Sequence, residues 1–362
     1  MKTYQHKYSI FHEGIRRYEI AMQGIPDRVP MYAQLHDFAR KEKGVSAAEF
    51  YTNSEILVTS SLETMKRWGV DYPIIDYDVY NIEAEALGQK IFYSANGIPD
   101  IDRTQPLIQS HGDLKKIKTP DFKRAGRFPQ VLRMYSLFRE LTDIEPDLNF
   151  CAPFTLAANL RGIEQLLMDI LMAPGFARDL LTRITEEVLI PWIWHLKSEF
   201  PETKAICGSD AMSSLPIVNL DILEDWSATY ISRLRQACGS EIYVPNWIGE
   251  SHLKDPLKMF DLKLKVCPRF LEGQDPDVAH IGPEVYKEYA ENKGVALILG
   301  IGSSFLTSSR PQDIVKRIQH YITAGGKNGR FCLYLCSVDS VTPVENLKAA
   351  VQAIHRFGTY SK

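Results

Sequence analysis

Eight short apolar segments of the chain are each followed by polar or aromatic side chains of types that bind ligands or catalyse reactions. The side chains are His36, Asp37, Asp76, Asp78, Tyr80, Phe154, Thr155, Asp210, Asn246, Trp247, Glu250, Glu272, Asp275, Ser303, Ser304, Cys336 and Asp339. Carboxylates suit general acid–base catalysis. Together with histidine and a thiolate they also suit a divalent metal, and zinc is favoured where sulfur takes part. The aromatic members suit a wall for a ring-bearing ligand.

Cys336 has three alternative roles on this pattern. Residues 331–336 are an apolar run typical of a buried strand, and Thr342-Pro343 has the residue types of a helix start. A thiol between the two is a buried packing residue, a nucleophile or a metal ligand. Simpler interpretations exist for other members too, because Asp210 can cap a turn and Trp247 can belong to the core.

The segments that must position these residues alternate between strand and helix patterns. Helical patterns, several of them ending at glycine, lie between most of the apolar runs. Such alternation predicts a parallel sheet, and eight units in 362 residues predict a single (β/α)8 TIM barrel over 1–362, with an insertion at 80–126. A doubly wound sheet is disfavoured, because no Gly-x-Gly-x-x-Gly follows the first run. The predicted strands are 28–35, 71–76, 148–154, 204–210, 241–247, 264–270, 295–300 and 330–336.

Composition narrows the class of protein. A formal charge of -3 gives no polybasic signature for nucleic acid or an anionic membrane surface. No apolar run approaches the roughly 18–20 residues that span a bilayer, and the N-terminus has no apolar signal-peptide core. The six cysteines are scattered, so we expect reduced thiols and a cytoplasmic protein.

Several segments together resemble the uroporphyrinogen decarboxylase superfamily. Residues 16–34 resemble its first helix and strand, 152–181 its Gly-Pro-Phe-Thr segment and following helices, and 335–354 its last strand and helix with Thr-Pro-x-Glu-Asn. The Glu-Ala-Glu-Ala-Leu-Gly at 83–88 resembles the corrinoid-dependent methyltransferase branch. The decarboxylases carry a histidine where this chain has Cys336, and the thiol methyltransferases carry a zinc-binding cysteine there.

The chain also departs from the thiol-methylating members. They have His-x-Cys where this sequence has Asn246-Trp247-Ile248. The resemblance is closer to the first methyltransferases of O-demethylase systems. It therefore implies transfer of a methyl group from a small methoxyaromatic compound to a corrinoid. No Asp-x-His-x-x-Gly is present in the chain, so the corrinoid is expected on a separate protein that docks at the barrel mouth. We allow for a homodimer.

From this resemblance and the strand-end positions we assign roles to individual residues. We expect zinc to be bound by Cys336, Glu250 and Asp275, with Asp210, Glu272 and His36 as further candidate ligands. The alternatives are a methylcobamide:thiol methyltransferase, a uroporphyrinogen decarboxylase-like lyase, or a scaffold without activity. We expect Asp210, Glu272 and Cys336 to be catalytic, and the substrate to be bound by His36, Asp76, Tyr80, Phe154, Asn246 and Trp247.

Overall fold

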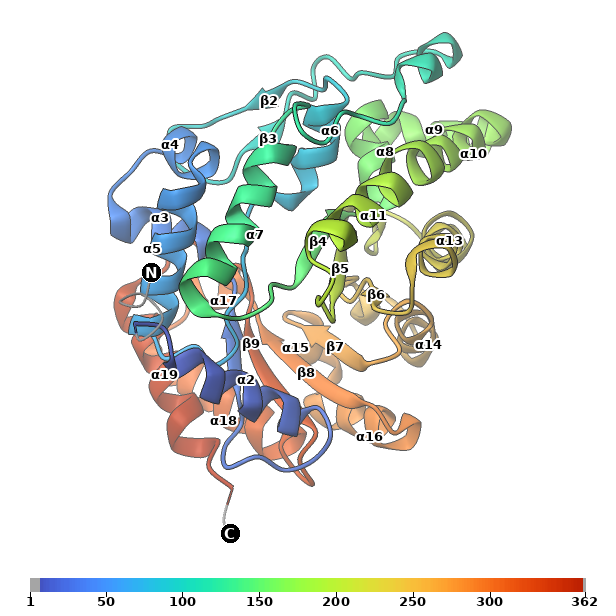
Figure 1. Cartoon of the computed structure of the whole chain (residues 1–362). Helices are drawn as coiled ribbons and strands as arrows, with labels where there is room; N and C mark the ends of the chain where they lie inside the picture. The colour runs from blue at the N-terminus through green and yellow to red at the C-terminus, as the bar shows by residue number, and fades with distance from the viewer. Residues whose placement is uncertain (1–6, 361–362) are drawn as a thin grey trace.

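The chain folds into a barrel of parallel strands surrounded by helices, in a computed structural model that describes residues 7–360 (Figure 1). Two sheets form the barrel wall, one with the strand order β1-β9-β8-β7 and one with the order β4-β5-β6, and every pair within them is parallel. The predicted TIM barrel is thereby confirmed. The strands are β1 (Met31–Ala33), β4 (Leu148–Cys151), β5 (Ile206–Ser209), β6 (Ile242–Tyr243), β7 (Phe270–Gln274), β8 (Ala296–Ile301) and β9 (Phe331–Leu335).

Helices connect the strands and cover the outside of the barrel (Figure 1). Proline occupies the first position of four of them, α8, α10, α16 and α18, where its missing N–H costs nothing. The helices are α2 (Ile10–Ala21), α3 (His36–Lys43), α4 (Ala47–Thr52), α5 (Ser54–Arg67), α6 (Ile82–Ala86), α7 (Phe128–Thr142), α8 (Pro153–Arg161), α9 (Ile163–Met172), α10 (Pro174–Arg183), α11 (Ile190–Glu199), α12 (Leu220–Ile222), α13 (Thr229–Cys238), α14 (Leu257–Val266), α15 (Asp277–Ile281), α16 (Pro283–Lys293), α17 (Ser303–Ser308), α18 (Pro311–Gly325) and α19 (Val344–Phe357).

The predicted second strand, 71–76, runs between the two sheets without a regular strand ladder. At its start the backbone N–H of Asp71 donates to the carbonyl of Met31 on β1, at 2.8 Å. Further along, the Asn149 side chain on β4 donates to the carbonyl of Ile75, at 3.3 Å. These contacts place the segment at the position of the second strand of the barrel, although it does not form a regular strand.

The predicted strand at 264–270 was wrong in its position. Residues up to Val266 form the end of α14, and the strand β7 begins only at Phe270. Leu262 and Val266 are both buried and are four residues apart, which is the spacing of one helix face. Pro268 then interrupts the apolar run, because proline cannot donate to a strand ladder.

Side chains along the strands alternate between two apolar clusters. On β9, Phe331, Leu333 and Leu335 belong to the large core between the barrel and its helices. Cys332 and Tyr334 belong to a smaller cluster with residues such as Ile298 of β8, inside the barrel. This two-residue period is what a strand requires when both of its faces are covered. The inside of the barrel, which we call the lumen, is therefore reached by every second residue.

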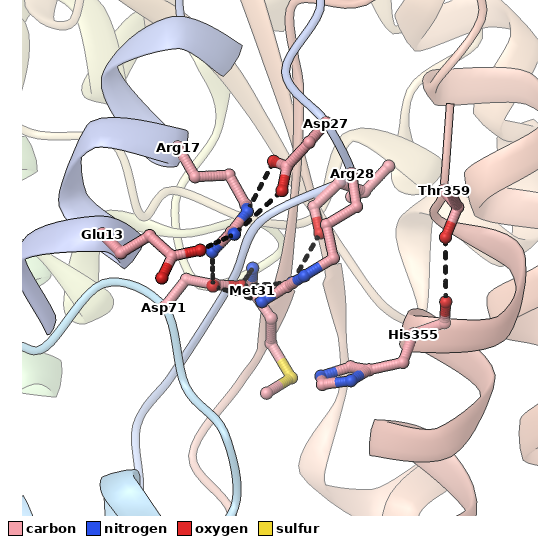
Figure 2. A network of polar contacts seen from close by, with 9 residues as sticks. Glu13, Arg17, Asp27, Arg28, Met31, Asp71, His355 and Thr359 are labelled. Carbon is pink, nitrogen blue, oxygen red and sulfur yellow. Dashed lines mark hydrogen bonds and ion pairs between the residues drawn. The ribbon is translucent and has the colours of Figure 1, made fainter. Parts of the chain in front are cut away.

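Helix α2 is fixed to the start of the barrel wall by an ion network, which Figure 2 shows. Arg17 of α2 donates to Asp27 and Asp71 at 2.7 Å each, and Arg28 donates to Asp71 at 2.6 Å. A second oxygen of Asp71 accepts from the backbone N–H of Met31 at 2.9 Å. Asp71 is buried, so its charge needs these partners. The network places α2 at the amino-terminal end of the strands.

The stretch 80–126, predicted as an insertion, contains α6 and a two-stranded antiparallel hairpin of β2 (Ile91–Phe92) and β3 (Asp100–Ile101). It lies at the top of the view in Figure 1. Within residues 7–360, no helix combines the length and the apolar character that crossing a bilayer requires.

Candidate active site

The lumen contains a cavity of about 320 Å³. Its volume is in the range of small-molecule sites, which begins at about 300 Å³. The wall is made by the inward-facing residues of the strands and by the loops that follow them. The lining residues include Tyr18, Tyr32, Gln34, His36, Tyr72, Ile74, Asp76, Tyr80, Ile98, Asp147, Asn149, Ser209, Tyr243, Asn246, Phe270, Glu272, Gln274, Tyr334 and Ser337.

The charge of this wall has one sign. Among the described residues that line the cavity there is no lysine or arginine, whereas four carboxylates are present. Asp78 is neutralised from behind by Arg127, whose Nη2 lies 2.6 Å from its Oδ2. The other three carboxylates are Asp76, Asp147 and Glu272. A cavity with this wall favours neutral aromatic ligands or hydrogen-bond donors over anions.

Glu272 lies on β7 with its carboxyl group in the lumen. Its Oε1 accepts from the side chain of Gln274 at 2.6 Å, and its Oε2 accepts from the hydroxyl of Tyr32 at 3.2 Å. Burial raises the pKa of Glu272, and the bond from Gln274 and the charge of Lys263 oppose that rise only in part. A carboxyl group whose proton is held to higher pH is suited to donate it to a ligand in the cavity.

Asp76 and His36 lie close together at the carboxyl end of the barrel. The Nε2 of His36 lies 3.3 Å from Oδ2 of Asp76, and its Nδ1 lies 2.6 Å from the hydroxyl of Tyr51. Burial raises the pKa of Asp76, while His36 and a long contact with Gln34 lower it. Both residues line the cavity, so the structure brings together these two predicted substrate-binding residues.

Tyr80 and Asn246 make a further part of the wall, as neighbours across the lumen. Asn246 donates from Nδ2 to the hydroxyl of Tyr80 at 3.0 Å, and its Oδ1 accepts from the backbone N–H of Asp210 at 3.0 Å. These two bonds fix the orientation of the Asn246 amide. Tyr80 therefore offers its hydroxyl proton to the cavity as a hydrogen-bond donor.

Asp210, predicted as catalytic, is fully buried and its oxygens are occupied by donors from the protein. It accepts from the backbone and hydroxyl of Thr155 at 3.0 and 2.8 Å, from Ser227 at 2.5 Å, from Ser213, and from the indole of Trp247 at 3.0 Å. It is not among the lining residues. Asp210 is a buried anchor that ties the ends of three strands together, and it has no free oxygen for a ligand.

Trp247 and Phe154, predicted to bind substrate, are fully buried and also lie outside the lining. Both belong to the large core between the barrel and its helices. The indole of Trp247 points toward Asp210. The aromatic wall of the cavity comes instead from tyrosines on the strands, with Tyr32 and Tyr334 stacked at 4.3 Å between ring centroids.

Cys336 is buried beside Gly300 and Gln274 at the carboxyl end of the lumen. A β-carbon on Gly300 would meet the Sγ atom of Cys336, so the glycine makes room for the thiol. Burial raises the pKa of Cys336, and the charges of Glu272 and Asp275 raise it further. A thiol in such a place stays protonated, which opposes the thiolate form that a nucleophile needs.

The other two predicted metal ligands are paired elsewhere. Glu250 is fully buried behind the barrel wall, with Oε1 2.7 Å from Nζ of Lys263. Asp275 accepts from Arg317 at 2.9 Å and from the hydroxyl of Tyr321. Neither residue lines the cavity.

The donor set does not fit zinc. Among residues 7–360 no group of three or more His, Cys, Asp or Glu side chains is gathered in a way that could hold a metal ion. Structural and catalytic zinc sites need at least three such protein ligands. The structure thus does not bring Cys336, Glu250 and Asp275 together as a metal site.

Several lining residues were absent from the sequence prediction, which considered only strand ends. They are Tyr32, Gln34, Asn149, Gln274, Tyr334 and the deeper residues Tyr18, Tyr72, Asp147 and Tyr243. A signal for part of them exists in the sequence. Polar and aromatic residues recur at every second position through Tyr32, Gln34 and His36 and again through Phe270, Glu272 and Gln274.

Comparison with known proteins gives the family. The family described as "Uroporphyrinogen decarboxylase (URO-D)" matches residues 17–357. A solved methyltransferase from Methanosarcina mazei has a similar fold, with a TM-score of 0.76 and 19% identity over 94% of this chain and 98% of that one. A B12-independent methionine synthase from Shewanella sp. W3-18-1 matches at a TM-score of 0.46 and 13% identity, over 86% and 90% of the two chains. No curated protein matches the sequence. The chain belongs to the uroporphyrinogen decarboxylase (URO-D) family.

Proposed function

We propose that the protein transfers a methyl group from a phenyl methyl ether to the corrinoid of a separate protein. The observation that carries the proposal is the cavity itself: small, walled by tyrosines, without lysine or arginine among its described lining residues, and provided with the buried acid Glu272. A methoxyarene is a neutral, flat molecule that matches such a wall. The similar fold of a methyltransferase agrees with methyl transfer.

The same wall argues against decarboxylation of uroporphyrinogen. That substrate carries many carboxylates, and a site for it needs several cations. The described lining residues include no lysine or arginine that could bind those carboxylates.

The difficult step is loss of the aryl oxide, because a phenolate is a poor leaving group. The bond between methyl carbon and oxygen breaks, its electron pair stays on the oxygen, and a proton is needed there. Glu272 is suited to supply that proton, because burial raises its pKa. Hydrogen bonds from Gln274 and Tyr32 fix the orientation of its carboxyl group. The products are then a phenol and a Glu272 carboxylate that takes a new proton from solvent.

The corrinoid would supply the nucleophile that accepts the methyl group. Residues of this chain would orient the ether so that its methyl group faces the carboxyl end of the barrel, where a partner can approach. Exposed apolar side chains lie in loops at this end, with Ile98 and Ile217 46% exposed and Val341 67% exposed. They fit the apolar face of a macrocycle or its protein carrier.

The test is to mix the protein with a reduced corrinoid protein and a panel of methoxyarenes, and to follow both corrinoid absorbance and release of the phenol. We expect both signals together, and strong loss of both in Glu272→Gln. The matched control is Glu284→Gln, which alters an exposed carboxylate on α16. Carbon dioxide release from a porphyrinogen without either signal would overturn the proposal.

A further inference from the structure

The cavity continues past Glu272 to the amino-terminal end of the lumen. Its deepest lining residues are Tyr18, Tyr72, Asp147, Tyr243 and Phe270, which we call the lower pocket. Tyr18 comes from α2, Asp147 directly precedes β4, and Phe270 is the first residue of β7. None of the chemistry assigned above uses them.

Asp147 is the polar centre of the lower pocket. Its Oδ2 accepts from the hydroxyl of Tyr72 at 2.9 Å. Within residues 7–360 this is the one hydrogen bond that the Asp147 carboxylate makes, and it forms no ion pair there. A carboxylate can accept about four hydrogen bonds. A purely structural Asp147 would have its oxygens filled, as those of Asp210 are, yet Asp147 instead faces a cavity.

Aromatic rings surround this carboxylate. The rings of Tyr18 and Tyr72 lie 4.2 Å apart between centroids, and those of Tyr243 and Phe270 lie 5.7 Å apart in an edge-to-face arrangement. Arg269 lies over the ring of Tyr243, 5.2 Å from its centroid, and is not a lining residue. The pocket thus offers flat apolar walls with one acceptor at the end.

Glu272 and Asp147 are two acids that line the same cavity at different depths. Glu272 lies two residues beyond Phe270 on β7, one inward-facing step of about 7 Å nearer the carboxyl end. A benzene ring with substituents at opposite ends covers a step of this length along the barrel axis. One substituent would reach the lower pocket while the other stays beside Glu272.

We propose that the lower pocket is a second binding subsite, which recognises a hydroxyl group at the ring end remote from the methyl ether. This inference rests on the proposed function for the ether, but the subsite itself does not. A phenolic hydroxyl donates to the carboxylate oxygen of Asp147 that Tyr72 leaves free. A carboxylate at the same ring position meets the charge of Asp147, which the charge of Arg269 behind the wall offsets only in part, because burial still raises the pKa of Asp147.

The test is calorimetric binding of small aromatic compounds to the purified protein, which needs no corrinoid. We compare 4-methylphenol with toluene, and 4-methoxyphenol with methoxybenzene and 4-methoxybenzoate. We expect each phenol to bind about tenfold or more tighter than its partner without the hydroxyl, because a hydrogen bond to a charged group is worth roughly 1.5–3 kcal/mol. We expect 4-methoxybenzoate to bind most weakly.

Asp147→Asn should remove most of the preference for phenols, and the control Asp143→Asn should keep it, because Asp143 lies at the end of α7 outside the lumen. Equal binding of 4-methylphenol and toluene to the unaltered protein would overturn the inference, even if no variant folds. Tighter binding of the cation 4-methylbenzylamine than of 4-methylphenol would overturn the hydroxyl assignment in favour of an ammonium group.

The two proposals fail separately in this design. 4-Methylphenol has no methyl ether, so the part of its binding that depends on Asp147 reports the lower pocket without the ether. If it binds through Asp147 while 4-methoxyphenol gives no methyl transfer, the proposed function is lost and the subsite remains. If methyl transfer proceeds without any preference for hydroxylated donors, the subsite is lost and the function remains.

Discussion

The hydroxyl of Tyr32 on β1 donates to the carboxyl group of Glu272 on β7, at 3.2 Å across the lumen. The two residues are 240 positions apart in the sequence. This bond fixes the orientation of Glu272 inside the cavity, and burial raises its pKa although the bond opposes that rise.

Glu272→Gln should lower kcat for 4-methoxyphenol by about 100-fold or more, which is the usual contribution of a general acid. The effect should shrink with 3-chloro-4-methoxyphenol, which leaves as a more acidic phenol and needs less protonation. The measurement is phenol release by both enzymes on both compounds. An equal loss on the two ethers would show that Glu272 is not the proton donor.

Asp210→Asn should destabilise the fold. The change converts one acceptor oxygen into a donor that faces the donors Ser213, Ser227 and Trp247. We expect a loss of roughly 2–4 kcal/mol in the free energy of unfolding, measured by thermal or urea denaturation. The neighbouring exposed change Asp221→Asn is the control. A variant as stable as the parent but inactive would return Asp210 to the catalytic residues.

Glu83→Gln should stabilise the protein increasingly as the pH rises. Burial raises the pKa of Glu83 to about 8, so the folded state holds this proton while the unfolded state releases it near pH 4.5. Stability is therefore lost as the pH rises between these two values, and the loss levels off above pH 8. Glutamine has no proton to lose, and its Oε1 can keep the bond from the N–H of Cys151 at 3.1 Å.

We accordingly expect the difference in melting temperature between Glu83→Gln and the parent to grow from pH 5 to pH 8 and then to stay constant. The limiting difference corresponds to a free energy on the order of 5 kcal/mol. The exposed change Glu49→Gln should give a small difference that does not grow. A gap independent of pH would mean that Glu83 is ionised in the folded state.

Cys336→Ser should leave the metal content of the purified protein unchanged. The thiol is buried against Gly300, and no group of candidate ligands is gathered around it in the described part of the chain. Its raised pKa also predicts slow alkylation of native protein at pH 8. Elemental analysis of both proteins is the measurement. Stoichiometric zinc that disappears in Cys336→Ser would restore the metal site.

The sequence was sufficient for the barrel and for a smaller part of the cavity wall. Apolar runs with helices between them predict parallel strands, because each run must be covered on both faces. Residues at or just beyond strand ends, such as His36, Asp76, Asn246 and Glu272, were found for the same reason. The pattern also placed one strand wrongly, at 264–270, because a short apolar run at the end of α14 fits either element.

What the sequence could not give is the direction of a side chain at a strand end. Asp210 follows β5 directly, as a catalytic carboxylate would, yet it turns toward Thr155 and Trp247. Asp147 lies before its strand and was not considered, although it reaches the lumen. Helical residue Tyr18 closes the cavity from below, and its place depends on the tertiary contacts of α2.

The pairing of β1 with β9 has a consequence for synthesis of the protein. Tyr32 on β1 has its register partner in Tyr334 on β9, and Arg28 forms a bridge with Thr359. Strand β1 thus has no hydrogen-bonded neighbour on its β9 side until nearly the whole chain has left the ribosome. During translation its edge stays open to other strands, so nascent chains should depend on chaperones until the last strand arrives.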